Sequence, residues 1–123
     1  MTPALFVVVA LAGGAGAALR YVLDLVVARL VGSRFPWGTL AINVTGSFAL
    51  GTVVGLGLPP EWTAVVGTGL LGGYTTFSSV AVTTALLAED GRTRAAVGNA
   101  VGTLVLATGA AWGGLALGVL LVG

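Results

Sequence analysis

The residues with the clearest chemical potential stand together in the third apolar stretch of the chain, at Gly72-Gly73-Tyr74-Thr75-Thr76-Phe77-Ser78-Ser79. Adjacent glycines followed by four Thr and Ser hydroxyls favour a break in a helix. A break frees backbone groups that a bilayer cannot satisfy, so it persists only where it is buried in protein or binds something. Freed carbonyls suit a hard cation such as Na⁺, whereas hydroxyl and N–H donors suit a small anion. A third interpretation, in which the hydroxyls bond back to their own helix, stays open.

A second candidate is Asn43, which lies several residues inside the second apolar stretch. A carboxamide at that depth needs hydrogen-bond partners, because lipid offers none. Its N–H₂ group can donate to an anion without the cost of embedding a full charge. The alternative is a hydrogen bond between helices that holds the protein together.

The first apolar stretch ends in two ionisable residues, Arg20 and Asp24. They are four residues apart, so on a helix they can form an ion pair. Ionisable groups within a membrane span are functional candidates by default. Because these two lie near the end of the span, a structural or entrance role is as well supported as a central one.

The charge map places these residues on four membrane-spanning helices. Hydrophobic residues make up 57% of the 123-residue chain and charged residues only 7%, against about a quarter in soluble domains. The charged positions leave the uncharged stretches 1–19, 35–60, 62–88 and 95–123. Roughly 20 apolar residues cross a bilayer as a helix. We therefore predict one all-α membrane domain over 1–123, with spans at about 3–31, 36–58, 62–88 and 94–122.

The glycines of the chain predict close packing between these helices. The chain has 21 glycines, and small residues spaced four apart let membrane helices approach closely. Such pairs recur at Gly51/Gly55, Gly69/Gly73, Gly98/Gly102, Gly109/Gly113 and Gly114/Gly118. The pattern predicts a tightly packed bundle.

Composition excludes several function classes. The chain has no Cys and no His, which removes thiol chemistry, the commonest general base and the commonest transition-metal ligand. The net charge of +1 argues against a nucleic-acid partner. We therefore expect no enzyme. No carboxylate lies centrally in any span, which favours passive conduction over proton-coupled export.

Three motifs resemble the Fluc (CrcB) family of bacterial fluoride channels: residues 13–21, the pattern from Gly38 through Asn43 to Gly51, and residues 72–78. They follow one another in the family order over essentially the whole chain. The resemblance implies a subunit of a fluoride-selective channel in the bacterial plasma membrane, which lowers fluoride toxicity by passive export. It also implies an antiparallel dimer with two narrow pores. Two alternatives are a small dual-topology drug or cation exporter, which would need a Glu absent from residues 3–19, and a structural membrane protein.

The family resemblance also assigns roles to residues. It implies a central structural Na⁺, shared between subunits and bound by the backbone carbonyls of Gly72 and Thr75. It places Asn43 in the pore as the amide donor and Phe77 as the aromatic whose electropositive ring edge faces the anion. The remaining residues of the implied fluoride path are Thr76, Ser78, Ser79, Val80, Asn99 and Thr103.

One position departs from the family pattern, because Val80 stands where a second pore phenylalanine is usual. The arginines depart as well, since Arg29, Arg34, Arg92 and Arg94 all flank the 1–2 and 3–4 connections. Arginine in short loops fixes topology, so this bias predicts both termini outside. A chain with one fixed orientation needs a different, oppositely oriented partner, so we favour a heteromer with a second Fluc-type subunit over a homodimer.

Overall fold

The computed structural model describes all 123 residues and is entirely helical. Four of its helical segments are long and apolar enough to cross a membrane. The first is α1 (Pro3–Val31), the second α2 (Trp37–Leu56) and the last α6 (Thr93–Val122). The third is interrupted and consists of α3 (Pro60–Trp62), the π-helix η1 (Thr63–Leu71), α4 (Gly72–Tyr74) and α5 (Ser78–Glu89). The predicted all-α fold with a break in the third helix is confirmed.

The helix ends follow from local chemistry. Thr2 precedes Pro3 and its hydroxyl accepts a hydrogen bond from the Leu5 N–H (3.1 Å), which caps α1. Gly32 follows α1 and Gly57 follows α2, both with positive φ values (82° and 64°) that suit glycine. These ends leave only short connections between the spans.

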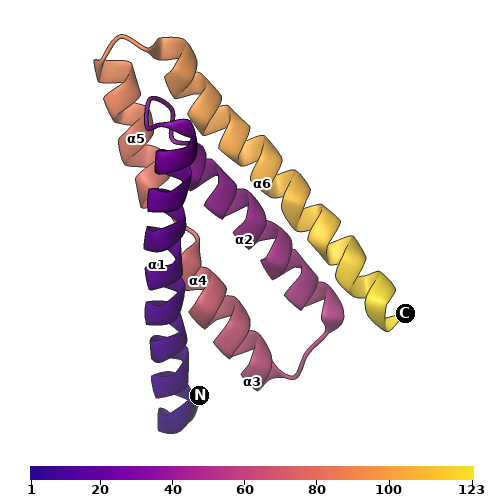
Figure 1. The fold of residues 1–123 in the computed structure, drawn as a ribbon. Coiled ribbons are helices and arrows are strands. Elements are labelled where there is room, and N and C mark those ends of the chain that lie inside the picture. The colour runs from indigo at the N-terminus through magenta and orange to yellow at the C-terminus, as the bar shows by residue number, and fades with distance from the viewer.

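Two parallel helices, α2 and α6, form the most extensive contact in the protein, and both run from the loop end towards the end with the termini (Figure 1). Glycines on each helix lie against backbone of the other. A Cβ on Gly51 or Gly55 would overlap carbonyls of α6, and a Cβ on Gly114 or Gly118 would overlap carbonyls of α2. These two predicted glycine pairs therefore join one helix pair.

The other close contact joins α1 to the third helix. A Cβ on Gly73 would overlap the carbonyl of Gly13, and one on Gly16 would overlap the carbonyl of Leu70. Gly69 also lies near the backbone of Val9, where a Cβ would come within 2.8 Å of the Val9 carbonyl. The third helix is thus positioned by glycine contacts immediately before its break.

The prediction of tight packing is wrong within the subunit for Gly98 and Gly102, because neither has any atom within 4 Å of a built Cβ. Gly109 is equally open. The spacing rule fails here because four-residue spacing places two glycines on one face without specifying which helix that face meets.

The two ends of the protein differ in charge. The 1–2 and 3–4 connections lie together at one end, where Arg92 donates a hydrogen bond to the backbone carbonyl of Arg34. Both termini lie at the opposite end (Figure 1), which has Glu61 as its only charged side chain. The arginine-rich connections therefore share one face of the protein.

Candidate functional site

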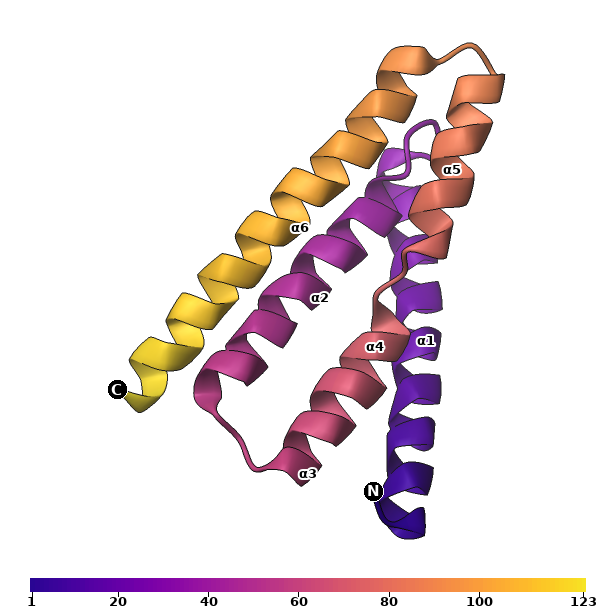
Figure 2. The same ribbon diagram turned by 180° about the vertical axis from the view of Figure 1, so that it is seen from behind.

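The break in the third helix lies at residues 75–77, just after the glycines (Figure 2). Thr75 is extended, with φ −78° and ψ 158°. Gly72 itself is helical (φ −63°, ψ −37°). We had expected the glycines to form the break. They instead bring the third helix against α1 immediately before it.

Asn43 holds the break through two reciprocal hydrogen bonds. The Thr76 N–H donates to Asn43 Oδ1 (2.8 Å), and Asn43 Nδ2 donates to the Thr76 carbonyl (2.9 Å). Asn43 is only 6% exposed. Of the two interpretations left open above, the bond between helices is present. Nδ2 carries a second N–H that this pair does not use.

The hydroxyls around the break divide between two roles. The Thr75 hydroxyl donates back to the Leu71 carbonyl (2.9 Å), as in the third interpretation. The Thr76 hydroxyl instead accepts from the Ser79 N–H (3.1 Å) and lies 3.3 Å from the Ser78 hydroxyl, so it caps the first turn of α5. These bonds stabilise the helical segments on both sides of the break, the one that ends before it and α5 after it.

The carbonyls of residues 72–75, at the start of the break, have no protein partner. Among the backbone hydrogen bonds outside the regular helices, none is accepted by a carbonyl of residues 72–75. The Thr76 N–H, which in a continuous helix would bond the Gly72 carbonyl, bonds to Asn43 instead. Oxygen ligands of this kind match the donor set of a hard cation. Gly72 and Thr75, the residues implied as Na⁺ ligands, belong to this group.

A cavity of about 340 Å³, here called the central cavity, adjoins the break. It brings together Asn43, Thr76, Phe77, Val80 and Thr103, five of the predicted path residues. The Phe77 side chain is 84% exposed, although it lies at the middle of the third span. An aromatic ring that exposed at a helix break is available to another subunit or to an ion.

A smaller cavity of about 170 Å³, here called the arginine cavity, lies on the other side of Thr76. Its lining includes Arg20, Asp24 and Ser79. The Arg20 Nε is buried without a hydrogen-bond partner. The structure contains no Arg20–Asp24 ion pair, although the spacing allows one. Asp24 lies instead against Gly38 in the first turn of α2. There the positive end of the helix dipole stabilises a carboxylate.

Asn99 and Thr103 lie one turn apart on α6, and only Thr103 lines the central cavity. Asn99 Nδ2 donates to the Thr84 hydroxyl (2.9 Å), and its Oδ1 is buried without a partner. The Thr103 hydroxyl is also buried without a partner and lines the cavity. Asn99 is not among the lining residues, and Ser78 lines neither cavity, so the structure separates these two from the cluster.

Sequence reasoning missed Ser47 and Thr108, which also line the central cavity. A signal for Ser47 was present, because it follows Asn43 by four residues and therefore shares its helix face. Thr108 carried no such signal, since its membership depends on how α6 lies along α2.

Sequence comparisons relate the chain to a family of known proteins. Residues 7–115 match the family described as "CrcB-like protein, Camphor Resistance (CrcB)". The "Fluoride-specific ion channel FluC 1" of Leifsonia xyli subsp. xyli is 52% identical over 126 residues, covering 99% of this chain and 92% of that protein. The "Fluoride-specific ion channel FluC" of Rhodospirillum centenum is 42% identical, covering 89% and 90%. The "Fluoride-specific ion channel FluC 2" of Mycobacterium tuberculosis is also 42% identical, covering 90% and 88%.

Proposed function

The chain belongs to the CrcB family of fluoride channels, and from that premise we propose that it is a subunit of a fluoride-specific ion channel. As a multi-pass membrane protein of a bacterial family, it lets fluoride leave the cytoplasm passively. Fluoride enters cells as neutral HF and ionises inside, so an inside-negative membrane drives the anion out without coupling to protons. The absence of a central carboxylate agrees with this mechanism.

The observation that carries the proposal is the break held open by Asn43. Its two hydrogen bonds to Thr76 fix an irregular backbone segment at the depth where an ion meets its highest barrier. Asn43, which keeps a spare N–H, and Phe77 both line the central cavity. Both are electropositive groups without a full charge, so they can stabilise a small anion without trapping it.

The fluoride path in this proposal starts in the arginine cavity and enters the central cavity past Thr76, which lines both. Arg20 and Asp24 act at the entrance. An unpaired guanidinium attracts anions, and the nearby carboxylate limits how tightly they are held. The path residues are Asn43, Thr76, Phe77, Ser78, Ser79, Val80, Asn99 and Thr103, with Asn99 and Ser78 supporting its walls.

We also propose a structural Na⁺ at the carbonyls of Gly72 and Thr75. The absence of protein partners for this stretch of backbone supports the site. When bound, the ion supplies a fixed positive charge at the middle of the membrane and joins the breaks of two subunits. Carbonyl oxygens carry no net charge, so the ligands leave that positive charge uncompensated.

The proposed partner is a second, oppositely oriented Fluc-type subunit of different sequence. The arginine-rich end fixes one orientation of this chain. Val80 is 9% exposed and lines the central cavity, so the usual second phenylalanine of the family is missing from the cavity wall. An oppositely oriented homologue with both phenylalanines supplies the ring edges that this chain lacks.

Growth tests the proposed function directly. A bacterial strain deprived of its own fluoride exporters should grow in millimolar fluoride when it expresses this chain with its partner subunit. An Asn43→Asp variant places a negative charge in the path and should not restore growth. Equal growth with the wild-type chain and the Asn43→Asp variant would contradict the proposal. So would no growth with either of them, if a known fluoride channel restores growth in the same strain.

Orientation is tested in a chain that has no native cysteine. A single cysteine at Ser33, in the 1–2 connection, is labelled from each side of the membrane. Labelling from the cytoplasmic side alone is expected. Labelling from both sides, with full fluoride transport by this chain alone, would show that the heteromer proposal is wrong.

A further inference from the structure

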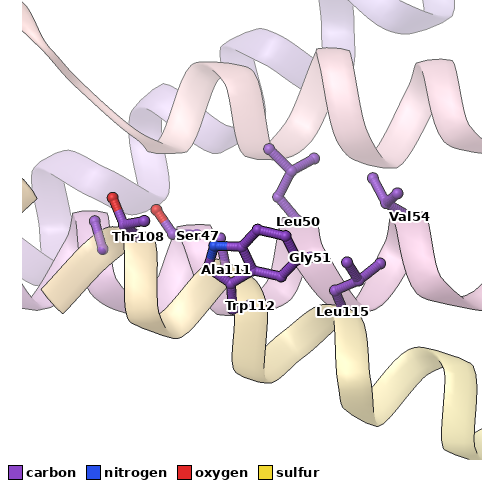
Figure 3. Close-up of a pocket in the computed structure, with 9 residues that line it drawn as sticks. Ser47, Leu50, Gly51, Val54, Thr108, Ala111, Trp112 and Leu115 are labelled. Carbon is purple, nitrogen blue, oxygen red and sulfur yellow. The ribbon is translucent and has the colours of Figure 1, made fainter. Parts of the chain in front are cut away.

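The central cavity continues into a second hollow of about 450 Å³ between α2 and α6, here called the α2–α6 groove (Figure 3). The two share Ser47, Ala107 and Thr108 as lining residues. From there the groove follows α2 as far as Val54 and α6 as far as Leu115. The groove therefore leads from the middle of the membrane towards the end of the protein without arginines.

The hydroxyls at the start of the groove are free. Thr45 and Thr52 of α2 donate back to carbonyls of their own helix (2.8 and 2.9 Å), the usual solution for a hydroxyl in a membrane. Ser47 lies between them on the same helix and forms no hydrogen bond, and Thr108 forms none either. Both line the groove, so their unused O–H donors are available to an occupant.

Trp112 adds a third donor to these two. It lies one helical turn beyond Thr108, about 6 Å along the axis of α6, and its side chain is 68% exposed. Tryptophan in membrane proteins is enriched at the two interfaces, where its N–H meets water. Trp112 lies instead towards the middle of α6, and its indole nitrogen is on the side of the ring nearer to Ser47 and Thr108 (Figure 3).

We propose that the Trp112 indole N–H, together with the Ser47 and Thr108 hydroxyls, forms a second fluoride subsite on the outer half of the path. The inference rests on the proposed function and extends it past the central cavity. The indole N–H can only donate, and the groove lining contains no carboxylate. The site therefore favours an anion over a cation. Fluoride leaving Phe77 meets these donors before it reaches the end of the protein.

A matched pair of substitutions tests the subsite by transport. Trp112→Phe keeps an aromatic ring and removes the N–H, while Trp62→Phe makes the same change at an exposed residue outside both cavities. Fluoride efflux from liposomes should fall about tenfold or more for Trp112→Phe, the effect of losing one hydrogen bond to an ion. It should stay at the wild-type rate for Trp62→Phe.

A binding measurement avoids dependence on how well the variant folds. The wild-type chain has three tryptophans, so ¹⁵N-tryptophan labelling gives three indole signals, which Trp62→Phe and Trp37→Phe assign by elimination. Added fluoride should shift the Trp112 indole proton and leave the other two in place. Gluconate at equal ionic strength should shift none of the three.

The outcomes separate this inference from the proposed function. If the wild-type protein itself releases no fluoride, the proposed function fails. If the wild-type protein conducts, Trp112→Phe conducts at the same rate, and fluoride does not shift the Trp112 indole signal of the wild-type protein, the proposed function stands and the subsite does not exist.

Discussion

Replacing Asn43 by alanine removes both hydrogen bonds that hold the break in the third helix. The Thr76 N–H and carbonyl would then face the interior without a partner, because Asn43 is their only one. Each unsatisfied buried group costs about 1–3 kcal/mol, so the free energy of unfolding should fall by about 2–6 kcal/mol. Fluoride flux should fall sharply as well, since the break loses its shape.

The assay is unfolding of the detergent-solubilised protein by SDS, followed by tryptophan fluorescence at one fixed protein concentration. Thr52→Val is the matched control on the same helix, because the Thr52 hydroxyl bonds only to its own backbone. Its stability should change by no more than about 0.5 kcal/mol. Asn43→Asp should lose at least as much stability as Asn43→Ala, because it buries a charged carboxylate whose oxygen faces the Thr76 carbonyl.

A loss for Asn43→Ala no larger than that for Thr52→Val would refute this reasoning. It would mean that Thr76 finds other partners and that the break does not depend on Asn43. Wild-type flux in the same variant would also remove Asn43 from the path.

Three further predictions concern packing, the pore and the cation. Gly73→Ala should destabilise the protein by about 1–3 kcal/mol, because its Cβ overlaps the Gly13 carbonyl; thermal unfolding should show no such loss for Gly14→Ala, whose Cβ meets open space. Phe77→Ile should lower fluoride flux sharply without changing the elution volume of the assembly, and undiminished flux would remove Phe77 from the pore. Replacing Na⁺ by N-methylglucamine throughout purification should lower the thermal stability of the assembly and its flux, and sodium should restore both; indifference to sodium would count against the cation site.

The fold was largely predictable, because the few charged residues divide the chain into four uncharged stretches, each long enough to cross the membrane. Residues 62–88 also signalled a break, and the structure has one. Its position and cause were not predictable. Gly72 and Gly73 looked like the break itself, but both are helical and Gly73 packs against Gly13. The hydrogen bonds that define the break come from Asn43, on a different helix.

The site was predictable only where its signal was local. Asn43 stood out as a carboxamide inside a span, whereas Phe77 was assigned through the family resemblance. Arg20 and Asp24 have the spacing of an ion pair, yet the carboxylate lies against Gly38 of α2 instead. Ser47 and Thr108 join the cavity only because α2 and α6 run in parallel with interlocking glycines. Pairing of that kind depends on tertiary packing, which no local pattern specifies.

Passive, selective fluoride conduction is the central claim, and efflux from proteoliposomes tests it most directly. Liposomes loaded with potassium fluoride and potassium chloride, and containing this chain with its partner subunit, are diluted into halide-free medium, and both halides are followed with selective electrodes. The account predicts that valinomycin triggers rapid release of fluoride while chloride stays inside, without any imposed proton gradient. Retention of fluoride, release of both halides together, or fluoride release that requires a proton gradient would contradict it.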